Sequence, residues 1–162
     1  MKRLVAVVAL AAIFLLVVQG APLFYYPPAE VTAPTNTQEL RTIQLKEQTI
    51  RVSVADTEST RAQGLSGRSG LAADEGMLFV FPQDGEYAFW MKDMRFAIDI
   101  LWLSADPSTG SGQAVVVYMA ENVSPDTYPQ SFRPNAPARY VLELPAGYAG
   151  AHSVEIGDRV EF

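Results

Sequence analysis

Polar residues of both signs gather between residues 61 and 103, beside a large amount of apolar sequence. Because a buried charge is costly unless it is paired and hydrogen-bonded, these side chains are expected to meet and to form the main polar site. A carboxylate on a later strand is expected to join them. The candidate ligand-binding residues are therefore Arg61, Arg68, Trp90, Lys92, Asp93, Asp99 and Glu143. None of them is predicted to be catalytic.

Asp99 is notable because it lies inside an apolar strand, FAIDILWL, at residues 96–103. Side chains alternate along a strand, and here both faces are apolar enough to be at least partly buried. The carboxylate is therefore expected to pair with a cation or to be neutralised, and the candidate cations are Arg61, Arg68 and Lys92. Such a pair would either fix the fold or hold an acid in a ligand pocket, and the sequence leaves both interpretations open.

Arg61 and Arg68 lie in the segment RAQGLSGR, which two glycines interrupt. The planar guanidinium of arginine suits carboxylate or phosphate ligands, and it equally suits loop carbonyls and internal carboxylates. Glu143 can pair with one of these arginines or with Arg139 on its own strand. Structural and ligand-binding roles are both open for these residues.

Trp90 and Lys92 share one face at the end of a predicted strand, and Asp93 follows them. A tryptophan beside a lysine can form the wall and the polar lip of a pocket, where a sugar or a peptide could stack. The alternative is that Trp90 packs in the core.

The composition excludes several classes of function. The chain has 162 residues and a formal charge of −6, and an acidic surface repels phosphate backbones, so no nucleic-acid partner is predicted. The absence of cysteine excludes disulfides, thiol nucleophiles and zinc–thiolate sites. His152 is the only histidine and lies in a predicted turn, so neither a metal nor a cofactor is predicted.

Residues 1–26 predict a signal peptide or a membrane anchor. Two basic residues precede an apolar run from Leu4 to Val18. A signal peptide would be cut near Ala21, whereas an uncleaved anchor would hold the inner membrane through residues 4–26. The remainder is expected to be extracytoplasmic, either membrane-anchored at the periplasmic or cell surface, or secreted after cleavage.

Residues 27–38 are rich in proline and threonine, which is typical of an extended tether. Residues 39–162 are long enough for a single folded domain. Many short strands and one short helix predict an all-β domain, mostly antiparallel and sandwich- or barrel-like.

The expected elements follow from the alternation of apolar residues and from the turn residues. Residues 41–46 and 49–55 predict a hairpin, and Asp56 is expected to cap a short helix that continues to Leu65. Further strands are predicted at 77–81, 86–91, 96–104, 114–121 and 139–144, with 153–156 and 159–162 flanking a turn. Residues 122–138 read as a long surface loop and residues 145–150 as a turn or helical turn.

Five motifs occur in order along residues 40–162: RxxGLxGR from Arg61, GMLFxF from Gly76, FWMK from Phe89, IDI from Ile98 and VLELxAG from Val141. In these motifs the chain resembles the domain-of-unknown-function 192 family of small bacterial and archaeal proteins. The resemblance implies an all-β, sandwich-like domain that is often exported or anchored, and it implies no catalytic residues. It places Arg61, Arg68, Trp90, Asp99 and Glu143 at signature positions. The chain has Asp93-Met94 where the family usually has Asn-Thr.

Three functions remain open. The first is a membrane-tethered extracytoplasmic domain that binds a small ligand or an envelope component through the polar site. The second is a structural or protein-interaction module in which the same residues only stabilise the fold. The third is a cell-envelope hydrolase that uses Asp99 and Glu143 as paired carboxylates, which would require them to lie roughly 5–10 Å apart in an open cleft.

Overall fold

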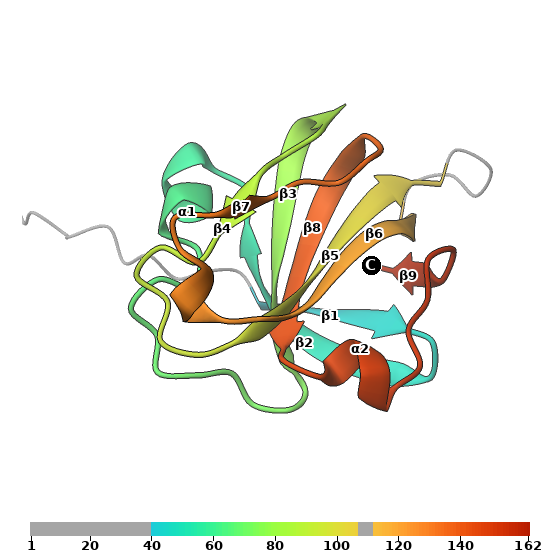
Figure 1. Ribbon diagram of the computed structural model, residues 1–162. Helices are drawn as coiled ribbons and strands as arrows, with labels where there is room; N and C mark the ends of the chain where they lie inside the picture. The colour runs from blue at the N-terminus through green and yellow to red at the C-terminus, as the bar shows by residue number, and fades with distance from the viewer. Residues whose placement is uncertain (1–39, 107–111) are drawn as a thin grey trace, which may run out of the picture. The chain divides into compact units, whose positions relative to one another are not determined.

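The computed structural model describes residues 40–106 and 112–162, and these form a closed barrel with an added two-stranded sheet (Figure 1). The strand order around the barrel is β1-β2-β3-β8-β5-β6-β9, and β4 pairs with β7. The all-β prediction is confirmed in its barrel form. The predicted anchor at residues 1–26 and the tether at 27–38 lie outside the described residues.

The strands are β1 (Leu40–Leu45), β2 (Gln48–Ala55), β3 (Glu75–Gly85), β4 (Phe89–Trp90), β5 (Ile98–Ala105), β6 (Gln113–Val123), β7 (Ser131–Phe132), β8 (Ala138–Pro145) and β9 (Arg159–Glu161). The helices are α1 (Glu58–Gln63), the 3-10 turn η1 (Pro125–Thr127) and α2 (Tyr148–Ala151). Within the described ranges, no helix is both long and apolar enough to cross a membrane.

The first hairpin forms as its alternating pattern predicts. β1 and β2 pair antiparallel, and Leu45 lies opposite Gln48 across a two-residue turn. Lys46 in that turn has a φ of 55°, in the left-handed region that tight hairpin turns use. The apolar side chains of the hairpin point into the barrel: Ile43, Leu45, Ile50 and Val52.

The connection from β2 to β3 brings α1 and a long loop onto the outside of the barrel. β2 and β3 pair in parallel, so the chain must return between them to the end of the barrel where β2 began. The helix α1 is shorter than predicted at both ends. Thr57 rather than Asp56 caps its start, through a capping box with Thr60, and Gly64, at a φ of 50°, ends it before Leu65.

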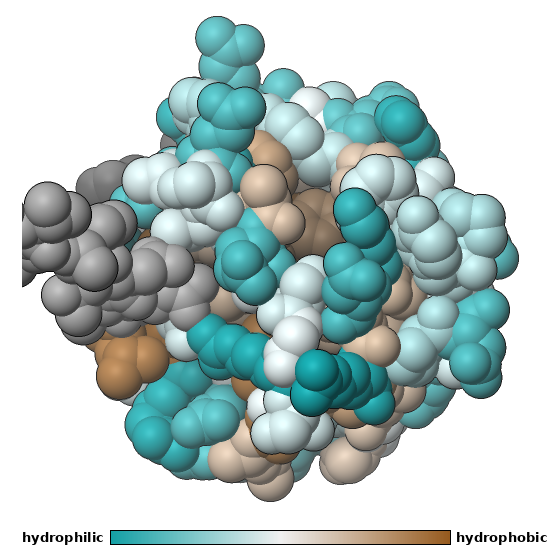
Figure 2. All heavy atoms as spheres, turned by 90° about the vertical axis from the view of Figure 1, so that its left-hand side faces the viewer, coloured by the Kyte–Doolittle hydropathy of each residue, from teal (hydrophilic) through white to brown (hydrophobic). Residues whose placement is uncertain are grey.

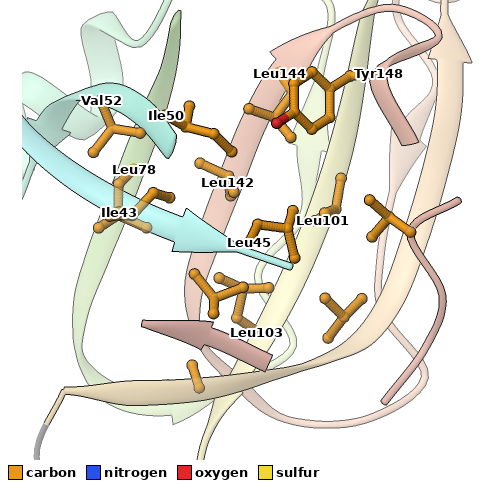
Figure 3. Close-up of a cluster of buried hydrophobic side chains, with 14 of the residues drawn as sticks. Ile43, Leu45, Ile50, Val52, Leu78, Leu101, Leu103, Leu142, Leu144 and Tyr148 are labelled. Atoms are coloured by element: carbon orange, nitrogen blue, oxygen red, sulfur yellow. The ribbon is translucent and has the colours of Figure 1, made fainter. Parts of the chain in front are cut away.

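Two apolar clusters lie on the two faces of the curved sheet. Figure 3 shows the inner cluster, whose side chains fill the barrel and come from all seven of its strands. The outer cluster lies between the barrel wall and the segments that cover it, and includes Met77, Phe79, Ile100, Trp102 and Val141 from the wall and Leu65 and Met91 from the cover. Along β5 the side chains alternate as predicted, with Leu101 in the inner cluster and Trp102 in the outer one.

Three predicted elements differ in extent. The strand predicted at residues 86–91 shortens to Phe89–Trp90, because only its two-residue partner β7 is available to pair with it. The predicted loop at residues 122–138 contains η1 and β7. Residues 153–156 form no strand. Instead, the N–H of Val154 donates to the carbonyl of Ala149 in α2.

Candidate functional site

A pocket lies on the outer face of the barrel, between α1 and the segment that carries β4. Its cavity volume is about 270 Å³. Figure 2 faces the side of the domain with α1 and β4 and shows apolar side chains recessed among hydrophilic ones. The walls are mostly apolar or aromatic, with a few polar groups, and are formed by Leu65, Phe79, Phe81, Tyr87, Phe89, Trp90, Met94, Arg61, Lys92 and Glu143, among others. A concave apolar site with few polar groups is the usual form of a small-molecule site.

Backbone and side-chain hydrogen bonds hold the covering segments in place. The hydroxyl of Ser66 donates to the carbonyl of Lys92 (3.1 Å), and the N–H of Gly67 donates to the carbonyl of Asp93 (3.1 Å). These bonds join the loop after α1 to the loop after β4. The two sides of the pocket are therefore fixed relative to each other at its base.

Arg61 fastens α1 to β3. Its Nη1 donates to the carbonyls of Asp56 and Val80, the latter at 2.9 Å, and its guanidinium carbon lies 5.2 Å from the centroid of the Phe81 ring. Of the partners that the sequence left open for Arg61, the structure shows backbone carbonyls, one in the loop before α1 and one in β3. Because Arg61 also lines the pocket, its positive charge acts there as well.

Glu143 lines the pocket from the barrel wall. It lies on β8, opposite Met77 of β3 and Ile100 of β5, so its side chain leaves the sheet among apolar neighbours. Only 5% of Glu143 is exposed, and its Oε2 atom has no hydrogen-bond partner among the described residues. Burial raises the pKa of this carboxyl to about 8, and the charge of Arg68 partly opposes that rise. The carboxyl is thus predominantly protonated at neutral pH.

Close packing fixes the backbone beside Glu143. A Cβ atom built on Gly76 would lie 2.8 Å from the carbonyl oxygen of Glu143 and 2.9 Å from Cδ2 of Leu144. Both distances are shorter than carbon contacts allow, so only glycine fits at this point of β3. This explains in physical terms why a glycine opens the GMLFVF segment.

Arg68 does not line this pocket. Its Nη2 lies 3.4 Å from the hydroxyl of Ser53, and the residue lines a separate hollow together with Arg51 and Glu75. Of the two alternatives for Glu143, Arg139 donates to the carbonyl of Pro82 instead, whereas the charge of Arg68 acts on Glu143. Arg68 therefore affects the site through its charge.

Among the described residues no cation pairs with Asp99, so the predicted ion pair with Arg61, Arg68 or Lys92 is wrong. Its side chain is fully buried, and its carboxylate accepts three backbone N–H groups: Asn122 (2.7 Å), Gly147 (3.1 Å) and Ala149 (2.8 Å). Backbone N–H groups can satisfy a buried carboxylate as well as a guanidinium does. A sequence does not show which backbone N–H groups will lie near a given carboxylate. Asp99 holds β6 and the start of α2 against the end of the barrel.

Asp99 and Glu143 lack the geometry that a paired-carboxylate hydrolase requires. Glu143 lies opposite Ile100, the residue after Asp99, so strand alternation directs the two carboxyls to opposite faces of the sheet. Asp99 is also sealed by its three donors. The two acids cannot flank one substrate.

Trp90 lies at the edge of the pocket rather than in the core. It is 57% exposed and lines the pocket, and its ring meets Tyr128 of the neighbouring loop edge-on at 6.2 Å between centroids. Lys92 is exposed on the same side, as the alternation predicted. Asp93 is exposed, has a φ of 56° and does not line the pocket.

The aromatic walls are the part of the site that sequence reasoning missed. Phe79 and Phe89 meet edge-on at 4.8 Å, and Phe81 stacks on Tyr87 at 3.5 Å. Alternation along β3 places Phe79 and Phe81 on the outer face, together with Met77. That alternation was visible, but nothing in the sequence showed that the outer face would also be covered.

The described residues contain no group of three or more His, Asp or Glu side chains that could hold a metal ion. The pocket has one carboxyl, and that carboxyl is buried among apolar side chains.

Comparison with known proteins places the fold and the family. The chain is similar to a proposed transcription regulator from Sinorhizobium meliloti 1021, known from a crystal structure, with 30% sequence identity and a TM-score of 0.68. The match covers 76% of this chain and 94% of the regulator. A protein of unknown function from Novosphingobium aromaticivorans DSM 12444 has 24% sequence identity and a TM-score of 0.69. That match covers 80% of this chain and 89% of the other protein, and it supports the fold alone. No curated protein matches the chain. The family model DUF192, described as "Uncharacterized ACR", matches residues 41–162, and the chain therefore belongs to the domain-of-unknown-function 192 family.

Proposed function

We propose that this protein is a membrane-tethered extracytoplasmic domain that binds a small ligand in the pocket between α1 and β4. The observation that carries the proposal is the buried carboxyl of Glu143, which lines the pocket and whose Oε2 has no hydrogen-bond partner among the described residues. Leaving a buried polar atom unsatisfied costs roughly 1–3 kcal/mol of folding free energy. A ligand that bonds to this carboxyl would remove that cost.

The ligand site differs from the one expected from the sequence alone. Arg61, Trp90, Lys92 and Glu143 contribute to it directly, and Arg68 contributes through its charge. Asp99 supports the fold beneath α2, and Asp93 lies outside the pocket. Polar and apolar atoms contribute about equally to the pocket surface, so the ligand is small and has both an apolar and a polar part.

Blocking the pocket tests the ligand-binding proposal. Ala62 lies on α1, is exposed and lines the pocket, so Ala62→Phe would fill its mouth without disturbing the core. Ala72→Phe is the matched control, because Ala72 is exposed and lines none of the pockets described here. In a thermal-shift screen of small acids, amines, sugars and short peptides, hits should be lost in Ala62→Phe and kept in Ala72→Phe. If no hit depends on position 62, the pocket is not a ligand site.

The membrane tether rests on the apolar run within residues 4–26 and is tested by fractionation. The full chain should remain in the membrane fraction after a carbonate wash, and added protease should reach the domain only from the extracytoplasmic side. Recovery of the full chain in the soluble cytoplasmic fraction would contradict the tether.

A protein-interaction role is the second candidate, and two exposed aromatic residues favour it. Trp90 and Tyr128 are 57% and 46% exposed, and their rings meet edge-on. Exposed aromatic side chains often anchor protein interfaces. In this case Trp90→Ala and Tyr128→Ala should abolish association with a partner, whereas Ala62→Phe should leave it unchanged.

A further inference from the structure

The Oε2 atom of Glu143, which has no hydrogen-bond partner among the described residues, restricts the chemistry of the ligand. A protonated carboxyl carries one O–H donor as well as acceptor oxygens, and its O–H needs an acceptor. The strands beside Glu143 present Met77 and Ile100, which offer none. The acceptor therefore has to come from the pocket side.

The permanently charged side chains that line the pocket are of one sign. Among the described lining residues, Glu143 is the only acid, whereas Arg61 and Lys92 are both cationic. Tyr87 is the other titratable residue of the lining, and Arg68 acts on Glu143 from the loop after α1. This positive region lies on a chain whose formal charge is −6, so it would attract anions locally against the overall field.

One part of the lining is apolar. Phe79, Phe81 and Phe89 form an aromatic corner, and Leu65 and Met94 also line the pocket. An anion with no apolar part would gain nothing from these walls and would lose its hydration. An apolar body attached to a single anionic group uses both parts of the site.

We propose that the ligand is a small carboxylate with an apolar body, which accepts the hydrogen bond of the Glu143 carboxyl while Arg61 and Lys92 balance its charge. This inference rests on the proposed ligand-binding function and names its substrate class. A hydrogen bond between a carboxyl and a carboxylate is charge-assisted and therefore stronger than one between neutral groups. An ammonium ligand would instead need Glu143 to be ionised and would be repelled by the two cations of the rim.

These alternatives predict opposite effects of pH. Because burial raises the pKa of Glu143 to about 8, raising the pH above that value removes the donated proton. Carboxylate affinity should then fall about tenfold between pH 7 and pH 9. The affinity for an ammonium ligand should rise over the same interval.

Three probes of similar shape test the proposal on the full-length protein: phenylacetate, phenylacetamide and 2-phenylethylamine. Binding is followed by calorimetry and by the fluorescence of the exposed Trp90. Phenylacetate should bind more tightly than 2-phenylethylamine at pH 7, and its affinity should fall about tenfold by pH 9. Glu143→Gln keeps an N–H donor but cannot ionise, so phenylacetate should still bind and its affinity should no longer fall in that interval.

The rim charge has its own control pair. Lys92→Gln should weaken phenylacetate several-fold without moving the midpoint of the pH dependence. Arg95→Gln should not change the affinity, because Arg95 is exposed and does not line the pocket. Equal effects of the two substitutions would show a general charge effect and would count against the site.

The outcomes separate this inference from the proposed function. Tighter binding of 2-phenylethylamine, or phenylacetate affinity that does not fall between pH 7 and pH 9, overturns the carboxylate assignment. Binding of the amine that Ala62→Phe abolishes would overturn this inference alone and leave the ligand pocket standing. If none of the three probes binds, the carboxylate assignment fails, and the broader screen with Ala62→Phe then decides the proposed function.

Discussion

Asp99 and Glu143 lie on neighbouring strands of one sheet, yet their carboxyl groups lie on opposite faces and have different hydrogen-bond partners. Glu143 pairs with Ile100, one residue beyond Asp99. The carboxylate of Asp99 accepts three backbone N–H groups, whereas the Oε2 atom of Glu143 has no partner among the described residues. The barrel wall therefore separates an acid that holds the fold together from an acid that faces a pocket.

Asp99→Asn is expected to destabilise the domain strongly. The amide has one acceptor oxygen, so at least one of the three backbone N–H groups would face an NH₂ group instead. The free energy of unfolding should fall by roughly 2–4 kcal/mol, as expected when a buried, charge-assisted hydrogen bond is lost. Urea unfolding followed by circular dichroism measures this change.

Asp84→Asn is the control for that substitution, because Asp84 is exposed on β3. Its effect should lie within about 0.5 kcal/mol of zero. Similar stabilities for Asp99→Asn and Asp84→Asn would show that the three backbone contacts contribute little.

Gly76→Ala is expected to disturb the contact between β3 and β8. The added Cβ would lie 2.8 Å from the carbonyl oxygen of Glu143, and neither backbone can move without breaking the ladder. Overpacking of this kind costs on the order of 1–3 kcal/mol. Gly70→Ala is the matched control, since no atom lies within 4 Å of a Cβ built there. A shift in melting temperature no larger than that of the control would contradict the close packing.

Thr57→Ala should loosen α1 and, with it, the roof of the pocket. The Thr57 side chain accepts the N–H of Thr60 and completes a capping box, so its loss should lower stability by about 1 kcal/mol. Amide hydrogen exchange should accelerate first in residues 58–63, while the barrel strands remain protected. Uniform acceleration across the barrel would show that α1 does not open separately.

The all-β fold class was predictable from the sequence, because alternation along each strand already separates two faces, whereas the choice between a sandwich and a closed barrel was left open. Leu101 and Trp102 fall on the faces that their positions indicate. The hairpin around Lys46 was also predictable from local pattern. What the sequence could not show is which segments cover the outer face, since that depends on the parallel pairing of β2 and β3 over a long connection.

The site was predictable only in part for the same reason. Arg61, Trp90, Lys92 and Glu143 were identified as polar groups that ought to meet, and all four line one pocket. The sequence could not reveal the partners of Asp99, because they are backbone N–H groups, which nearly every residue type carries. An ion pair with a cation was therefore predicted instead. The aromatic walls were missed because Phe79 and Phe89 look like ordinary core residues in the sequence. Their role in the pocket depends on the segments that cover the outer face of the barrel.

Glu143→Gln is expected to flatten the dependence of stability on pH. The carboxyl has a pKa of about 8 in the folded protein and close to 4.5 in the unfolded chain, so the folded state binds more protons between these values. Stability therefore falls as the pH rises from about 4.5 to about 8 and levels off above that.

The substitution removes this contribution. Between pH 4 and pH 9 the wild type should therefore lose on the order of 5 kcal/mol more stability than the variant does. Urea unfolding at both pH values measures it. Parallel pH profiles for the two proteins would contradict a raised pKa.

The most direct test of the account is the protonation of Glu143 itself. The protein is labelled with ¹³C at the glutamate carboxyls, and the resonance that is absent from Glu143→Gln is followed by NMR as the pH is varied. The account predicts that this resonance titrates with a midpoint near pH 8 and that saturating phenylacetate moves the midpoint upward. A midpoint near 4.5, unchanged by phenylacetate, would mean that Glu143 is an ordinary solvated carboxylate, and the proposed site would then lose its basis.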